Sequence, residues 1–117
     1  MPAPVVHFEI LGKNVKELQK FYKDIFDWSI MTNNPINYGL VEASEEKGIG
    51  GGITSPKEDE ENYVTIYIEV DDIQAYLDKI NEAGGETIVP VTEIPGMVTF
   101  AMFLDPEGNK IGLIQSD

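Results

Sequence analysis

The side chains best suited to chemistry lie two residues apart near the start of the chain. His7 is the only histidine among 117 residues, and Glu9 follows it within the segment VVHFEI. Residues two apart in a strand point to the same face, so the imidazole and the carboxylate would stand side by side. Imidazole can act as a general acid or base near neutral pH, and a close carboxylate favours its protonated form. The pair is therefore a candidate for enolisation, epimerisation, or orientation of a carbonyl or enol ligand.

Two other interpretations of His7 stay open at this point. It could bind a divalent metal with Glu9 as a second ligand, or it could hydrogen-bond a neighbouring strand and fill space. A metal held by two side chains would be weakly bound, since a catalytic zinc normally has three protein ligands. The non-haem iron triad needs two histidines, and this chain has one. The absence of cysteine excludes thiolate zinc sites and cysteine nucleophiles.

The pattern around this pair predicts a strand followed by a helix, and the same order occurs twice. The strand candidate at 5–11 precedes residues 14–26, and the strand candidate at 63–70 precedes residues 71–85; both following segments repeat apolar residues at helical spacing. Three short strand candidates follow each helix: WSIMTN, YGLVEA and GIGGGI, then ETIVPV, MVTFAMFL and KIGLIQ. The sequence thus predicts an α+β fold of two tandem βαβββ modules.

The ends of the two helices carry suitable capping residues. Asn14 and Asp72 are candidate N-caps, because a short polar side chain can accept a hydrogen bond from the first turn. The glycine pair at 84–85 predicts the end of the second helix. Phe21, Tyr22 and Phe26 fall on the first helix with core spacing, and we interpret them as core packing.

Strand alternation predicts which residues face a ligand. In the strand at 63–70, Ile66, Ile68 and Val70 alternate with polar residues and are expected under the helix. Two such modules side by side are expected to curl into a cup-like mixed sheet with the helices outside. The residues predicted to face the cup, and to suit a small, partly apolar or aromatic ligand, are His7, Glu9, Tyr38, Thr65, Tyr67 and Phe103.

The charge composition of the chain disfavours some classes of binding partner. The chain has 21 acidic and 8 basic residues, a formal charge of −13, which repels phosphate backbones and anionic membrane surfaces. We therefore expect no nucleic acid or membrane partner. The start of the chain lacks the pattern of a secretory leader, so we expect a cytoplasmic protein of one domain. Within it, module one spans about 1–55, an acidic linker about 56–62, and module two about 63–117.

Four short motifs, in this order, carry a resemblance to a known family. They are HFEI at 7–10, GGGI at 50–53, TEIPG at 92–96 and DPEGNKIGLIQ at 105–115. With the tandem βαβββ pattern, the chain resembles the vicinal oxygen chelate superfamily of glyoxalases, bleomycin resistance proteins and dioxygenases. Within it, the chain is most similar to a glyoxalase-like group related to lactoylglutathione lyase. The resemblance covers essentially the whole chain and implies a homodimer.

The resemblance also implies a metal held by one residue on the first strand and one on the last strand of each module. His7 matches the first of these positions, and Thr65 stands where the second module often carries histidine. The last-strand positions, usually glutamate, fall within the glycines at 50–52 and on Gly112. Glycine offers no side-chain donor, so we expect no metal cofactor. The glycines themselves would allow close backbone approach or a bulge.

Three functions follow as expectations. The first is a module that binds a small organic ligand in the cup without a metal. The second is a metal-independent isomerase or lyase that uses His7 with Glu9. The third, a metal-dependent lactoylglutathione lyase, is disfavoured by the glycines at the implied ligand positions and by the acidic surface, which offers few cations for the carboxylates of glutathione.

Overall fold

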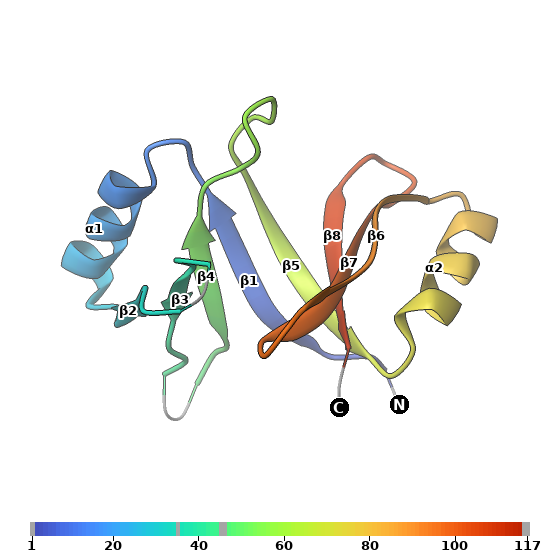
Figure 1. Ribbon diagram of the computed structural model, residues 1–117, viewed down its shortest axis with the longest axis horizontal. Helices are drawn as coiled ribbons and strands as arrows, with labels where there is room; N and C mark the ends of the chain where they lie inside the picture. The colour runs from blue at the N-terminus through green and yellow to red at the C-terminus, as the bar shows by residue number, and fades with distance from the viewer. Residues whose placement is uncertain (1, 35, 45–46, 116–117) are drawn as a thin grey trace. The chain divides into compact units, whose positions relative to one another are not determined.

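The computed structural model describes residues 2–34, 36–44 and 47–115 (Figure 1). The chain divides into two compact units, one formed by residues 7–65 and the other by residues 66–117 together with residues 1–6. We call these the first unit and the second unit. Each contains one helix and strands of a mixed sheet, in the predicted order of strand, helix and three strands. The predicted α+β class with a repeated βαβββ order is therefore confirmed.

The first unit forms its sheet in the order β2-β3-β4-β1. β1 (Val5–Leu11) contributes from His7 onward and pairs in parallel with β4 (Gly50–Thr54). β3 (Gly39–Val41) is antiparallel to β4, and β2 (Ile30–Met31) is antiparallel to β3. The regular β1–β4 register places His7 opposite Gly50 and Glu9 opposite Gly52. The glycines of β4 therefore lie beside the candidate residues of β1 without a bulge.

The second unit repeats this arrangement with longer strands. β5 (Tyr63–Val70) pairs in parallel with β8 (Lys110–Gln115), and the sheet continues through β7 (Val98–Leu104) to β6 (Glu86–Ile94). The β6–β7 register shifts twice, between Thr87 and Val89 and between Val89 and Thr92. Pro90 lies in this irregular stretch of an edge strand, where a residue without an N–H is tolerated.

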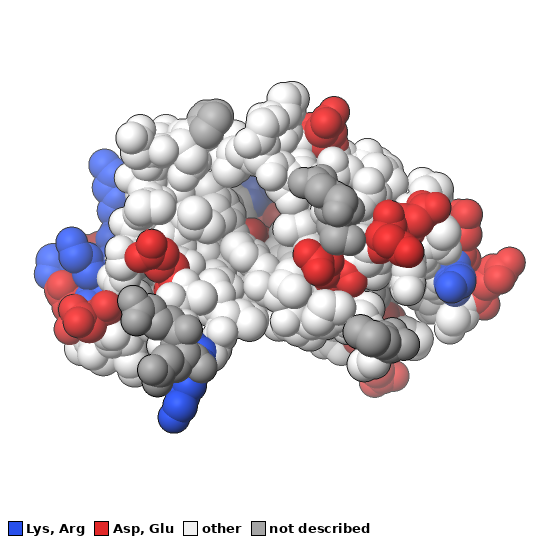
Figure 2. Space-filling view, turned by 90° about the horizontal axis from the view of Figure 1, so that it is seen from below, with Lys and Arg blue, Asp and Glu red and all other residues white. Residues whose placement is uncertain are grey.

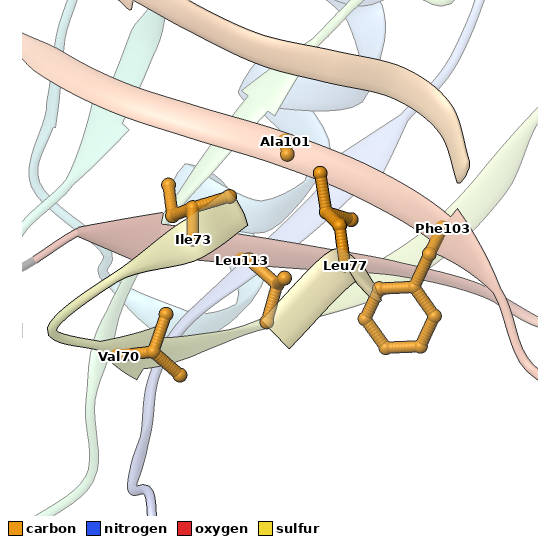
Figure 3. Close-up of a cluster of buried hydrophobic side chains, with 6 residues drawn as sticks. All are labelled: Val70, Ile73, Leu77, Ala101, Phe103 and Leu113. Carbon is orange, nitrogen blue, oxygen red and sulfur yellow. The ribbon is translucent and has the colours of Figure 1, made fainter. Parts of the chain in front are cut away.

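Helix α2 (Ile73–Glu82) covers one face of the second sheet and closes the main hydrophobic core. Figure 3 shows side chains from β5, α2, β7 and β8 meeting there: Val70, Ile73, Leu77, Ala101, Phe103 and Leu113. Asp72 Oδ1 accepts a hydrogen bond from Ala75 N at 3.2 Å, which confirms the predicted N-cap. The helix ends at the predicted glycines, because Gly84 has a positive φ and Gly85 N donates to Ile80 O.

Helix α1 (Val15–Phe26) packs less tightly than we predicted. None of its residues, all of which the structure describes, is buried; Phe21 is 54% exposed and Phe26 is 56% exposed. The interpretation of these two rings as core packing is therefore wrong. Asn14 precedes the helix, but its side chain makes no capping hydrogen bond to the described first turn, so this predicted N-cap contact is also wrong.

What holds α1 to its sheet is a small group of aromatic rings. Trp28 stacks on Tyr22 of the helix, with ring centroids 5.0 Å apart, and reaches Phe8 of β1 at 5.4 Å. Gln19 Nε2 of the helix also donates to Ile53 O of β4 at 2.8 Å. Phe8 is therefore on the helix side of the sheet, which leaves His7 and Glu9 on the other face. Trp28 therefore joins the helix to β1 through packing within the first unit.

The surface is strongly acidic, and Figure 2 shows acidic side chains exposed across the viewed face. Four of the eight basic residues lie in or next to α1, at positions 13, 16, 20 and 23.

Among the residues that the structure describes, no helix has the length and apolar character needed to span a membrane.

Candidate functional site

Three polar side chains of the first unit form a continuous hydrogen-bonded series. The Tyr38 hydroxyl donates to Glu9 Oε2 at 2.6 Å and lies 2.9 Å from His7 Nε2. His7 and Glu9 come from the same face of β1, and Tyr38 immediately precedes β3 on the other side of β4. The structure thus brings together three of the six residues predicted to face a ligand, and it adds a hydroxyl between the predicted acid and base.

Tyr38 is held in place by the turn that precedes it. Asn34 Oδ1 accepts from Tyr38 N at 2.8 Å, and Asn34 Nδ2 donates to Tyr38 O at 2.7 Å. One amide side chain thus hydrogen-bonds to both the N–H and the carbonyl group of Tyr38. Asn37 adopts a positive φ of 53°, a conformation that asparagine tolerates better than most residues. This contact between Asn34 and Tyr38 fixes where the hydroxyl points.

Gly52 creates the space that the Tyr38 hydroxyl occupies. A β-carbon added to Gly52 would overlap the hydroxyl oxygen and the adjoining ring carbons of Tyr38. Gly51, on the opposite face, would meet the ring of Phe8 at 2.5 Å. The glycines of β4 therefore permit close approach of aromatic side chains from both faces, which agrees with the first of the two interpretations of this segment.

Burial governs the protonation behaviour of the site. The pKa of His7 is lowered from its usual value by desolvation, which disfavours the charged imidazolium. Glu9 is only 8% exposed. Tyr63, in the same unit, has its pKa raised to about 12, first by burial and then by the negative charges of Glu60 and Glu9. The cluster therefore combines an imidazole that favours its neutral form with a buried carboxylate whose charge helps to raise the pKa of Tyr63.

The hydrogen bonds of this series join three of the six predicted residues; the other three are Thr65, Tyr67 and Phe103. Thr65 is buried in the first unit, at 3% exposure. Tyr67 lies in the second unit on the face opposite α2, with its ring over Gly112. Phe103 belongs to the core under α2, so the prediction that it faces a ligand is corrected: alternation along β7 directs its ring to the helix side.

The structure also tests whether these residues fit a metal. At both implied last-strand positions, a tyrosine ring covers a glycine: Tyr38 over Gly52 in the first unit and Tyr67 over Gly112 in the second. A glutamate at either glycine would overlap that ring. Within residues 2–34, 36–44 and 47–115, no group of three or more His, Cys, Asp or Glu side chains could hold a metal ion. The residues present do not fit the metal that the resemblance implies.

Each unit also has a surface recess. The recess of the first unit, about 610 Å³, lies between the start of α1 and the strand ends near Gly12 and Tyr63. The recess of the second unit, about 640 Å³, lies beside the turn at Gly96. None of His7, Glu9 or Tyr38, all described in the structure, lines either recess. The hydrogen-bonded series is therefore not part of the recess of the first unit.

Comparison with known proteins places this geometry in a family. The family model described as the Glyoxalase/Bleomycin resistance protein/Dioxygenase superfamily matches residues 5–113. The chain belongs to this superfamily, and the resemblance predicted from its four motifs is confirmed. A glyoxylase-like domain-containing protein from Didymella fabae is 29% identical over 111 residues, covering 86% of this chain and 84% of that protein.

Two solved structures share the fold at low identity. Hypothetical protein BH1468 from Bacillus halodurans C-125 matches with a TM-score of 0.73 and 15% identity, over 100% of this chain and 96% of that chain. Methylmalonyl-CoA epimerase from Mycobacterium tuberculosis matches with a TM-score of 0.70 and 11% identity, over 97% of this chain and 87% of that chain. At these identities the similarity is one of fold.

Sequence reasoning did not find Asn34, the residue that holds Tyr38. The available signal was the segment NNPINY, since asparagine next to proline is typical of a turn in which the side chain bonds to nearby backbone. The pairing of Tyr38 with Gly52 had no local signal, because the two residues are 14 positions apart and meet only through the β3–β4 hairpin.

Proposed function

We propose that this protein binds a small organic ligand with a carbonyl or enol oxygen next to His7, Tyr38 and Glu9, and that it does so without a metal. The observation that carries the proposal is the position of the Tyr38 hydroxyl, between His7 Nε2 and Glu9 Oε2 and over Gly52. A half-buried imidazole and hydroxyl in contact with a buried carboxylate offer both donors and acceptors to such an oxygen. The membership of the superfamily supports a small ligand, because relatives of this fold include proteins solved in complex with coenzyme A thioesters.

The single histidine makes binding directly measurable. Protein labelled with ¹⁵N would be titrated with 2-oxo acids, α-hydroxy ketones and β-diketones while the imidazole signals of His7 are followed. We expect at least one class to move these signals in a saturable way, and we expect the same compound to bind at least tenfold more weakly to the Tyr38→Phe variant, since one polar contact to a charged network contributes on that order. Binding of that compound that calorimetry finds unchanged in both Tyr38→Phe and His7→Ala, the second of which has no imidazole signal, would place the ligand elsewhere and contradict the proposal.

A second function, metal-independent isomerase or lyase chemistry, is favoured by the lowered pKa of His7. A neutral imidazole at pH 7 can accept a proton from a carbon next to a carbonyl, and Glu9 lies one hydroxyl away to balance the resulting charge. The test is incorporation of solvent deuterium into methylmalonyl-CoA, the substrate class named for a structural relative, and into simple 2-oxo acids. Exchange that is lost in His7→Ala, with binding retained, would support an enzyme; binding with little loss and no exchange would support a binding module.

A metal-dependent lactoylglutathione lyase remains the least favoured function. Both implied last-strand ligand positions are glycines covered by tyrosine rings, and the formal charge of −13 opposes an anionic thioether substrate. We expect no turnover of the hemithioacetal of methylglyoxal and glutathione after addition of zinc or nickel. The homodimer implied by the superfamily stays a prediction, and light scattering coupled to size exclusion at micromolar concentration tests it.

A further inference from the structure

We propose that Tyr38 is a positioning residue that fixes His7 in the tautomer with its proton on Nε2. The geometry sets the direction of the hydrogen bonds. The distance of 2.6 Å between the Tyr38 hydroxyl and Glu9 Oε2 is that of an O–H group donating to a carboxylate. A tyrosine hydroxyl has one proton, so an oxygen that donates to Glu9 can only accept from His7. The contact of 2.9 Å to His7 Nε2 is therefore an N–H donating to the hydroxyl oxygen.

This direction assigns different tasks to the two ring nitrogens. In the neutral ring, Nε2 carries the proton and Nδ1 carries the lone pair. Nδ1 is then the basic nitrogen of the neutral ring. When a proton leaves a ligand carbon or hydroxyl for Nδ1, the electron pair stays on the ligand and His7 becomes an imidazolium. The Nε2 proton stays in place, and the negative charge of Glu9, reached through Tyr38, stabilises the imidazolium.

The surroundings of Tyr38 are arranged to hold this direction. Asn34 grips the Tyr38 backbone from both sides, and Gly52 leaves room for the hydroxyl beside Glu9. Glu9 is directly opposite Gly52 in the register, so its carboxylate is the acceptor closest along the strand to the space that the hydroxyl fills. With its proton in place, Nε2 has no lone pair with which to bind a metal.

The inference rests on the proposed function for its chemical meaning, but its test needs no ligand, so either can fail alone. In protein labelled with ¹⁵N, the chemical shift of each ring nitrogen of the single histidine shows whether that nitrogen is protonated or unprotonated. Above the pKa of His7, we expect the spectrum of the ligand-free protein to report Nε2–H as the dominant tautomer. A dominant Nδ1–H form would reverse the series and overturn the proposal.

The Tyr38→Phe variant tests whether Tyr38 causes the preference. We expect the ratio of Nε2–H to Nδ1–H to fall roughly fivefold to tenfold, the effect of one hydrogen bond. Tyr76→Phe is the matched control, because it removes a hydroxyl from α2 in the second unit and should leave the ratio unchanged. An unchanged ratio in a folded Tyr38→Phe protein would overturn the assignment to Tyr38. If that variant does not fold, Asn34→Ala keeps the hydroxyl but loosens its position, and it should lower the ratio in the same direction.

Discussion

The Tyr38 hydroxyl lies where a β-carbon of Gly52 would be. A side chain at position 52 would displace the ring of Tyr38. Without Tyr38, the buried carboxylate of Glu9 would lose its short hydrogen bond. The same relationship occurs in the second unit, where the ring of Tyr67 covers Gly112. In both units an aromatic side chain fills the space from which superfamily members that bind a metal would extend a ligand.

The first prediction concerns this steric pairing. Gly52→Ala should lower the free energy of unfolding by about 1–3 kcal/mol, since an added methyl group forces the ring of Tyr38 away from a packed strand. Urea unfolding measures the change. Gly50→Ala, on the same strand, is the matched control, because the nearest atom to its β-carbon would be the Val41 carbonyl oxygen at 3.0 Å, so this change should cost less. In a double-mutant cycle with Tyr38→Ala, the cost of Gly52→Ala should largely disappear; simple additivity of the two changes would contradict the pairing.

The second prediction concerns pH. Because burial lowers the pKa of His7, the unfolded chain binds a proton at a higher pH than the folded chain does. As pH falls from about 7.5 through about 6.5, the usual pKa of histidine, towards the lower folded pKa, the wild-type protein should lose stability. His7→Gln removes this contribution, so the difference in unfolding free energy between the two proteins should change in that window. Parallel curves for both proteins between about pH 7.5 and about pH 5.5 would contradict the lowered pKa of His7.

The third prediction concerns Tyr63. Its pKa of about 12, raised by burial and by Glu60 and Glu9, means that this phenol ionises later than an ordinary tyrosine. When phenolate absorbance of the five tyrosines is followed, Tyr63→Phe should therefore remove one late step, near pH 12. The folded state should lose stability as pH rises above about 10, because the unfolded chain releases this proton first. A late part of the titration that has the same amplitude in Tyr63→Phe would contradict the raised pKa of Tyr63.

The fourth prediction compares the starts of the two helices. Asp72→Ala should lower stability by about 1 kcal/mol, because Asp72 Oδ1 accepts from Ala75 N in the first turn of α2. Asn14→Ala should cost clearly less, since the Asn14 side chain makes no such bond to the described start of α1. Thermal or urea unfolding of both variants provides the comparison. Equal losses would mean that Asn14 caps its helix in solution after all.

Much of the fold was predictable because its signals are local. Alternation along β5 correctly placed Ile68 and Val70 under α2, although Ile66, assigned to the same face, is exposed. The same alternation placed His7 and Glu9 on one face of β1, and both contact Tyr38. Helical spacing in α1 was equally clear, but spacing reports amphipathicity and not the amount of surface that is covered, so Phe21 and Phe26 were wrongly assigned to the core.

The candidate site was predictable only in part because its contacts are not local. Phe103 could not be assigned to a face until the register of β7 with β8 was known, and that register directs it to α2. Asn34 and Gly52 act on Tyr38 through a turn and across a hairpin. Patterns in a sequence identify a strand and its two faces. Which distant ring occupies the space beside a glycine depends on three-dimensional packing.

The most direct test of the account is the metal content of protein carrying no affinity tag. The protein would be purified without chelator, incubated with zinc, nickel, manganese or iron, passed over a desalting column and subjected to elemental analysis. We predict far less than one metal ion per chain, and an unchanged His7 imidazole spectrum before and after incubation. Retention of about one ion per chain with loss or displacement of the His7 signals would contradict the account, because His7 Nε2 would then be a ligand and not a donor to Tyr38.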